Sequence, residues 1–215
     1  MTRLIVVRHA QSIANLERVF LGHSDWDLSD LGREQAELLA KYLIEKKLPI
    51  DVIYSSDLIR PVHTVEPYAK ATGKEITRVK ELREIYAGEW EEKKFDDLLE
   101  KYPESYGVVW RTDIGNAKCD GGEAVSELYE RVNSAIDEIA QANDGKCVLV
   151  ATHATPLRAL IARAKGVGLD GMKDFYWGEN ACINIFEYSE GALSAVELLV
   201  SEHLGEARSG LPRTV

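Results

Sequence analysis

The chain has 215 residues, 45% of them hydrophobic and 29% charged, and a formal net charge of -10. This composition is that of an ordinary globular protein, and the length fits one domain with a sizeable core. The negative charge repels polyanions, so we expect no nucleic-acid partner. A small anion is still compatible with this charge, because salt screens surface charges beyond about 8 Å.

The cysteines and the first residues of the chain indicate in which cellular compartment the protein is expected. Cys119, Cys147 and Cys182 are odd in number and far apart, which favours reduced, buried thiols over a disulfide framework or a zinc site. No stretch has the length of a membrane span, and the chain enters its first apolar run at Leu4, which leaves no room for a signal peptide. We expect a cytoplasmic protein that does not bind membranes, and the sequence leaves a homodimer open.

The first predicted element is a strand at residues 4–7, where four consecutive aliphatic residues lack the polar alternation of a half-exposed strand. A polar run from Arg8 to Asn15 follows it. Further on, Ser29 is a suitable N-cap for a helix that Pro49 ends.

A second strand is predicted at 51–54, with Arg60 close to the start of the helix that follows. Pro67 should break or kink that helix, because proline lacks the N–H group that a helix interior uses. Residues 75–79 alternate with period two, which predicts another strand, and a loop follows to residue 90.

The stretch from about 89 to 120 has a different character, with one short helix around 95–102, no second strand signal and five aromatic residues. We interpret it as a small helical lid inserted into the domain. Its aromatic residues are expected to pack on one another rather than to bind substrate, since a small lid needs apolar contacts to stay closed. They are Trp90, Phe95, Tyr102, Tyr106 and Trp110.

A long helix is predicted after residues 121–123, with apolar residues at helical spacing up to Ile139. The aliphatic run 148–151 then predicts a second buried strand. Pro156 stands in the first turn of the next helix, where its missing N–H costs nothing.

Strands are predicted at 182–188 and 193–200 around a tight turn, and residues 201–215 are expected to form a mobile tail. The alternation of strands and helices predicts an α/β fold. We expect one domain over 1–215, a three-layer α/β/α sandwich with a mostly parallel central sheet and the small helical lid.

Both apolar strands, 4–7 and 148–151, are followed by a histidine and then an alanine. In an open α/β sheet, ligands bind outside the carboxyl ends of the strands. The sequence therefore predicts one site that holds His9 and His153 together, with Arg8 beside them.

Five motifs that include these residues occur in a fixed order. They are Arg8-His9-Ala10-Gln11-Ser12 with Asn15, Ser55-Ser56-Asp57-Leu58-Ile59-Arg60, Leu82-Arg83-Glu84-Ile85 with Gly88 and Trp90, Gly121-Gly122-Glu123, and Thr152-His153-Ala154. In this order they resemble the motifs of the histidine phosphatase superfamily, in its phosphoglycerate mutase-like branch, over residues 4 to about 190. Five motifs in order are far more specific than an Arg-His pair alone.

The resemblance implies a phosphohistidine enzyme with His9 as nucleophile and Glu84 as proton donor. Arg8, Arg60 and His153 would contact the phosphoryl oxygens. The implied substrate-binding set is Arg8, Asn15, Gly22, Arg60, His153 and Ala154. Three positions depart from the usual pattern of the family, which has glycine at Ala10, glutamine at Leu21 and glycine at Glu92; the change at Leu21 removes a polar contact to substrate.

The implied activity is that of a metal-independent phosphomonoesterase, a phosphoric monoester hydrolase of the histidine acid phosphatase type, acting on a small phosphorylated metabolite. No cofactor and no metal are expected, since no pair of histidines or cysteines has the spacing of metal ligands. One alternative is a cofactor-dependent phosphoglycerate mutase, whose lid resembles a longer, proline-rich insert, whereas residues 91–120 hold only Pro103. Another is a non-catalytic phospho-ligand-binding module, which would need neither the nucleophile His9 nor the acid Glu84.

Overall fold

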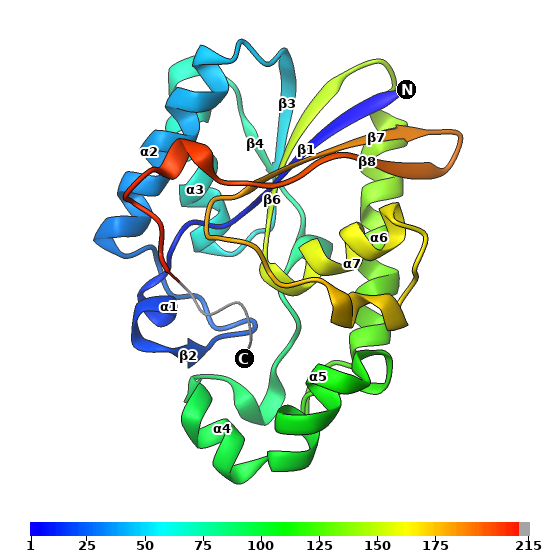
Figure 1. The fold of residues 1–215 in the computed structure, drawn as a ribbon. Helices are drawn as coiled ribbons and strands as arrows, with labels where there is room; N and C mark the ends of the chain where they lie inside the picture. Colours follow the sequence, from blue (N-terminus) through cyan, green and yellow to red (C-terminus); the bar gives the residue numbers. More distant parts are fainter. Residues whose placement is uncertain (211–215) are drawn as a thin grey trace.

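The computed structural model describes residues 1–210, which form a three-layer α/β/α sandwich with helices on both faces of one central sheet (Figure 1). The sheet has six strands in the order β4-β3-β6-β1-β7-β8. β4, β3, β6 and β1 pair with one another in parallel, β7 pairs antiparallel with β1, and the edge strand β8 pairs antiparallel with β7. This confirms the predicted fold class. The strands are β1 (Thr2–Arg8), β3 (Ile50–Ser55), β4 (Ile76–Arg78), β6 (Cys147–Thr152), β7 (Ile183–Ser189) and β8 (Ala192–Val200).

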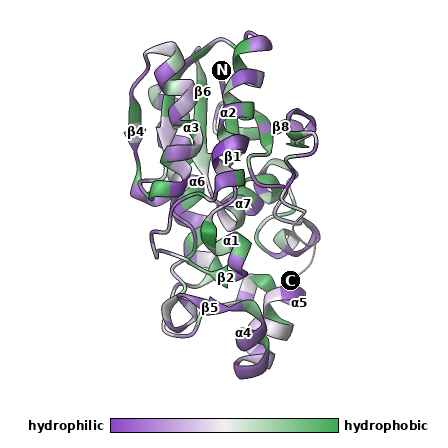
Figure 2. Cartoon of the chain, turned by 90° about the vertical axis from the view of Figure 1, so that its left-hand side faces the viewer, coloured by the Kyte–Doolittle hydropathy of each residue, from purple (hydrophilic) through white to green (hydrophobic). Residues whose placement is uncertain are grey.

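Side chains of β1 alternate between two hydrophobic cores, one on each face of the sheet. Ile5 and Val7 belong to the core that the helices α2 (Asp30–Glu45) and α3 (Ile59–Thr72) cover. Leu4 and Val6 belong to the opposite core, under α6 (Val125–Ala142) and α7 (Ala154–Ala164). All four side chains are fully buried, which explains why the strand has no polar alternation. Figure 2 shows the hydrophobic strands between helices with hydrophilic outer surfaces.

Helix α2 begins as predicted, because the Ser29 hydroxyl accepts a hydrogen bond from the Gly32 N–H. Helix α3 continues through Pro67 to Thr72, so the predicted break is absent. Burial of Val65 and Tyr68 in the core offsets the one backbone hydrogen bond that Pro67 cannot make.

The segment expected to be a lid contains α4 (Phe95–Lys101), a π-helical turn over Pro103–Val109 and the short α5 (Trp110–Thr112). The strand β5 (Lys93–Lys94) ties this segment to β2 (Val19–Phe20) by antiparallel pairing. That pair was not predicted, because two residues per strand give no periodic pattern. In the segment expected to be a lid, Trp90, Tyr106 and Trp110 are buried, and Trp90 packs edge to face against the other two rings, as expected for the aromatic residues. Movement of the segment as a lid stays a prediction.

Residues 201–210 contact the domain, which contradicts the mobile tail predicted there. Leu204 is buried, and the carbonyl of Ala207 accepts a hydrogen bond from the buried amide of Gln35, 2.7 Å away. The Ser209 N–H donates to Glu179. Glycine content suggested mobility, but a buried glutamine on α2 needs this backbone as its partner. The rest of the predicted tail, 211–215, lies outside the described residues.

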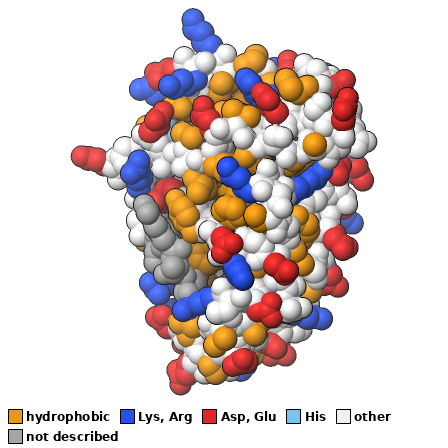
Figure 3. All heavy atoms as spheres, turned by 45° about the vertical axis from the view of Figure 1, so that its right-hand side comes forward, with side chains coloured by type: hydrophobic (Ala, Val, Ile, Leu, Met, Phe, Trp, Pro, Cys, Tyr) orange, Lys and Arg blue, Asp and Glu red, His pale blue; other side chains and the backbone are white. Residues whose placement is uncertain are grey.

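No helix in the described part of the chain combines the length and apolarity needed to cross a bilayer. On the face drawn in Figure 3, acidic and basic side chains are interspersed, and hydrophobic side chains gather near the middle.

Candidate active site

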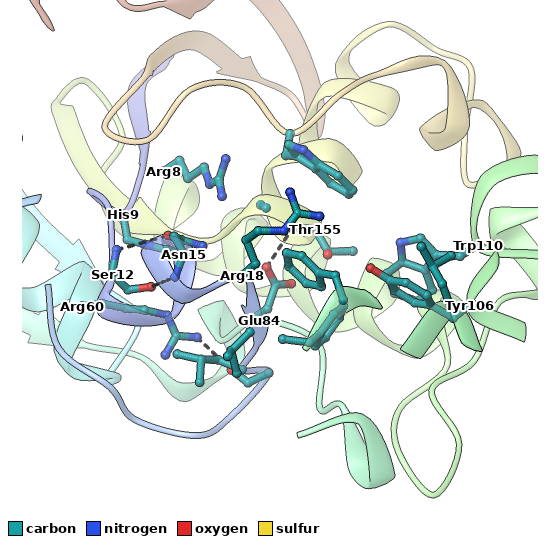
Figure 4. Close-up of a pocket in the computed structure, with 18 residues that line it drawn as sticks. Arg8, His9, Ser12, Asn15, Arg18, Arg60, Glu84, Tyr106, Trp110 and Thr155 are labelled. Atoms are coloured by element: carbon teal, nitrogen blue, oxygen red, sulfur yellow. Dashed lines mark hydrogen bonds between the residues drawn. The ribbon is translucent and has the colours of Figure 1, made fainter. Parts of the chain in front are cut away.

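A pocket of about 300 Å³ opens at the carboxyl ends of β1 and β6. Figure 4 shows Arg8, His9 and Arg60 on one side of it and Tyr106 and Trp110 on the opposite side. All but one of the side chains predicted to form the site line this pocket: Arg8, His9, Asn15, Gly22, Arg60, Glu84 and Ala154 do so, and His153 lies behind them.

The imidazole of His9 is fixed in one tautomer. Its Nδ1 lies 2.7 Å from the carbonyl oxygen of Ala10, which only accepts hydrogen bonds, so Nδ1 carries the proton. The other nitrogen, Nε2, then keeps its lone pair. Burial, and then the positive charges of Arg60 and Arg8, lower the pKa of His9 well below its usual range. The ring is therefore neutral and nucleophilic at neutral pH.

His153 packs against His9, with the two ring centroids 5.2 Å apart. It is fully buried, and burial followed by the charge of Arg60 lowers its pKa well below the usual range. Its Nε2 lies 2.9 Å from the Ser56 hydroxyl, while its Nδ1 has no partner within residues 1–210. His153 therefore lies beside His9, as the sequence predicts, but it does not line the pocket itself.

Two buried arginines face the pocket, and neither of them pairs with a carboxylate of residues 1–210. Arg8 donates from Nη1 to the carbonyl of Gly178 at 2.7 Å, and its Nε has no partner among the described residues. Arg60 donates to the carbonyls of Gly22 (2.8 Å) and Ser24 (2.9 Å). Burial lowers the pKa of both groups, that of Arg60 to about 10, so both stay charged at neutral pH. No ion pair found within 1–210 involves either arginine, and two unpaired buried cations call for an anionic ligand.

The loop that holds Arg60 is braced by Glu91, which sequence reasoning missed. Its two carboxylate oxygens accept hydrogen bonds from the N–H groups of His23 (2.7 Å) and Ser24 (2.8 Å). Gly22 has φ +53°, and a Cβ there would collide with the Glu91 carboxylate, so glycine is required. Glu91 carried no motif, and only this tertiary contact reveals its role.

Glu84 projects into the pocket from the loop after β4. Its oxygens accept hydrogen bonds from the N–H groups of Ile85 (2.9 Å) and Thr155 (3.2 Å), the latter in the first turn of α7. The loop is held from behind by Arg131 of α6, which donates to the Glu84 carbonyl at 2.9 Å and forms a fork with the Glu123 carboxylate at 2.6 and 2.8 Å. Glu123 belongs to a recognised motif, but Arg131 gave no signal in the sequence.

Asn15 completes the polar end of the pocket from α1 (Ile13–Glu17). Its Oδ1 accepts hydrogen bonds from the Ser12 N–H (3.1 Å) and the Asn180 amide (3.2 Å), which leaves the Nδ2 donors for a ligand. The described residues contain no group of three or more His, Cys, Asp or Glu side chains placed to hold a metal ion.

A family model for branch 1 of the histidine phosphatase superfamily matches residues 4–200. The chain belongs to this superfamily. The resemblance inferred from five ordered motifs is thereby confirmed.

Named relatives of this histidine phosphatase fall into two groups. The chain is 34% identical over 206 residues to phosphoserine phosphatase 1 of Hydrogenobacter thermophilus, which covers 96% of both chains. It is 32% identical over 191 residues to phosphoglycerate mutase-like protein 4 of Arabidopsis thaliana, which covers 87% of this chain and 80% of the relative. The solved structure of YhfR from Bacillus stearothermophilus superposes with a TM-score of 0.88 at 26% identity, covering 95% of this chain and all of that one.

The three departures from the superfamily pattern have visible consequences. Ala10 is buried and needs no glycine, since its backbone φ is not positive. Glu92 has φ +59°, a conformation that favours glycine, and its carboxylate accepts a hydrogen bond from Trp26. Leu21 lines the pocket and adds apolar surface to it.

Proposed function

We propose that this histidine phosphatase hydrolyses small phosphomonoesters through a phosphohistidine at His9, without a metal ion. The observation that carries the proposal is the neutral His9 ring, with Nε2 unprotonated, beside two buried arginines that pair with no carboxylate among the described residues. Arg8 and Arg60 are suited to hold the phosphoryl oxygens, and the Nδ2 donors of Asn15 can add a further contact. Gly22 and Ala154 line the same pocket, where we assign them to substrate binding.

In the first step of the proposed reaction, His9 Nε2 attacks phosphorus while the bond to the ester oxygen breaks, and Glu84 gives that oxygen a proton. In the second step, Glu84 takes a proton from a water molecule whose oxygen attacks phosphorus. The N–P bond breaks, its electron pair returns to Nε2, and phosphate leaves. The Nδ1 of His153, which has no hydrogen-bond partner within residues 1–210, supports a role in stabilising the phosphoryl group from behind His9.

Hydrolysis is favoured over mutase activity because a phosphoglycerate carries a carboxylate besides its phosphate. Beyond Arg8 and Arg60, the only other cationic side chain that lines the pocket within residues 1–210 is Arg18, whose guanidinium pairs with Asp96 at 3.3 Å. A non-catalytic binder is disfavoured by the presence of both His9 and Glu84. The lack of nucleic-acid and membrane partners, a homodimer and the cytoplasmic location stay predictions.

The finer assignment, to the histidine acid phosphatase type, is also a proposal. The pKa of His9 lies well below its usual range, so the nucleophile stays neutral in mild acid. We expect activity to persist below pH 6.5, and a pH profile of kcat/KM measures this directly.

The covalent intermediate gives the decisive test. Enzyme quenched after mixing with labelled substrate should carry an acid-labile, base-stable phosphoryl group, and turnover of p-nitrophenyl phosphate should be unaffected by EDTA. The label should disappear in His9→Ala and persist in the control His63→Asn, which alters a histidine that pairs with Asp27 outside the pocket. A label intact in His9→Ala would place the nucleophile elsewhere, and strong isomerisation of 3-phosphoglycerate would make the enzyme a mutase.

A further inference from the structure

The end of the pocket away from Arg8 and Arg60 is lined mainly by apolar side chains. We call it the leaving-group chamber and define it by Val19, Phe20, Leu21, Phe95, Leu99 and Trp110. Its walls come from two segments, β2 with the residue after it and the segment 95–110, which the pairing of β2 with β5 holds together. Phosphate bound at His9 would direct the rest of a substrate into this chamber (Figure 4).

The chamber walls are held by aromatic contacts. The Phe20 ring packs edge-on against Phe95 (6.0 Å between centroids), Tyr106 (6.2 Å) and Trp110 (6.2 Å). Tyr106 and Trp110 are almost fully buried. The aromatic residues expected only to pack therefore also shape the cavity that a leaving group would enter.

The charges near the chamber do not suit an amino acid. Among the described residues that line the pocket, Glu84 is the only one with a carboxyl group, and the proposed reaction uses that group to give and take a proton at the leaving oxygen. Within residues 1–210, the pocket lining offers no further acidic side chain to pair with an ammonium group. Apart from Arg8 and Arg60, the cationic side chain that lines the described part of the pocket is Arg18, which is 56% exposed and paired with Asp96. A charged leaving group would lose hydration here without gaining a buried partner.

We propose that the preferred substrates are phosphomonoesters of an apolar alkyl or aryl alcohol. This inference rests on the proposed function and specifies its substrate class. Phosphoserine, the substrate in the name of one relative, is accordingly a poor substrate of this chain. The family's usual glutamine at position 21 would offer a polar contact, and Leu21 replaces it with apolar surface that extends the chamber.

A series of straight-chain alkyl phosphates from ethyl to hexyl tests the proposal. The leaving alcohols have nearly equal basicity, so the series varies buried apolar surface while the chemistry stays constant. We expect kcat/KM to rise about fourfold with each methylene until the chamber is filled. Phosphoserine should be turned over more slowly than butyl phosphate. A flat series, or phosphoserine as the better substrate, would overturn the inference.

Two substitutions in the same segment locate the effect. Leu99→Ser should reduce the rise per methylene, because Leu99 lines the pocket, whereas Val108→Ser should leave it unchanged, because Val108 does not. The two side chains are comparably exposed, at 36% and 46%, so a general effect on folding would alter both variants. Equal slopes in both variants and the native enzyme would contradict the assignment of the chamber.

Labelling at His9 separates this inference from the proposed function. An enzyme that forms phosphohistidine with ethyl phosphate but shows no rise along the series has the proposed function and lacks the proposed specificity. An enzyme that forms no phosphohistidine with any ester in the series lacks the proposed function itself.

Substitution of Arg18 tests whether the pocket binds a substrate carboxylate. Arg18→Gln should slow the hydrolysis of phosphoserine and of butyl phosphate by similar factors. A loss confined to phosphoserine would show that Arg18 binds a substrate carboxylate, against the inference.

Discussion

At the scale of single residues, the role of Glu84 as proton donor and the role of Arg60 in binding the phosphoryl group can be distinguished by changing the leaving group of the substrate. Glu84 and Arg60 both line the pocket, but only Glu84 can supply a proton to the departing oxygen. An alkoxide leaves badly without that proton, while p-nitrophenolate leaves with little help. We expect Glu84→Gln to slow phosphorylation of His9 by an alkyl phosphate by ~10² to 10⁴, and by p-nitrophenyl phosphate much less. Single-turnover rates on the two substrates measure the difference.

Substitution of Arg60 should have an effect that does not depend on the leaving group. Arg60 donates to the carbonyls of Gly22 and Ser24 and faces the phosphoryl group, which is the same in every substrate. Arg60→Ala should therefore slow both substrates by comparable factors, ~10² to 10³ each. Equal losses in Glu84→Gln on the two substrates would instead reduce Glu84 to a positioning role.

At the scale of elements, helix α6 positions the loop that carries Glu84. Arg131 donates to the carbonyls of Glu81 (2.7 Å), Arg83 (2.9 Å) and Glu84 (2.9 Å). Arg131→Gln removes this anchor, and a carboxyl group displaced by about 1 Å loses up to ~10² in rate. We expect kcat for an alkyl phosphate to fall by ~10 to 10², with little change in the inhibition constant of inorganic phosphate, which depends on Arg8 and Arg60.

A matched control exists on α7. Arg163 is about as exposed as Arg131, at 18% against 22%, and also pairs with a carboxylate at 2.6 Å, that of Asp137, but it lies away from the pocket. Arg163→Gln should destabilise the protein similarly while leaving kcat close to the native value. If both variants lose the same activity, or if phosphate binding falls with kcat in Arg131→Gln, the anchoring role is refuted.

At the scale of the whole molecule, the buried histidines make stability depend on pH. Burial, with Arg60 nearby, lowers the pKa of His9 and His153 well below 6.5 in the folded state. Below pH 6.5 the unfolded chain therefore binds more protons than the folded protein, and the free energy of unfolding falls as the pH falls. Each such group lowers the free energy of unfolding by at most about 1.4 kcal/mol for each pH unit below its unfolded pKa. Urea unfolding in phosphate-free buffers measures this decline.

The slope of that decline identifies its source. Burial lowers the pKa of His23 and His203 as well, so His153→Gln removes one of four such imidazoles, and its stability should fall with pH less steeply than that of the native protein, whatever its stability at pH 7. An unchanged slope would mean that His153 is protonated in the folded protein. Carboxylates with lowered pKa values, such as Asp57 beside Arg83, add to the decline at lower pH, outside this window.

The sequence by itself determined the sheet and the polar end of the site. Its aliphatic runs at 4–7 and 148–151 are buried on both faces, so they could only be central strands, and parallel neighbours bring their carboxyl ends together. The histidines that follow those two ends, His9 and His153, are therefore brought together. Strand and helix periodicity is local information, and it was enough for this part.

Tertiary structure alone decided how these side chains are held and what surrounds them. Arg131, Glu91 and the carbonyl of Gly178 come from distant segments, and no local pattern marks a backbone atom as a hydrogen-bond partner. The same holds for the buried contact of Gln35 with the C-terminal stretch and for the chamber around Phe20. Which groups enclose a side chain depends on packing between elements, and that is fixed only when the whole chain has folded.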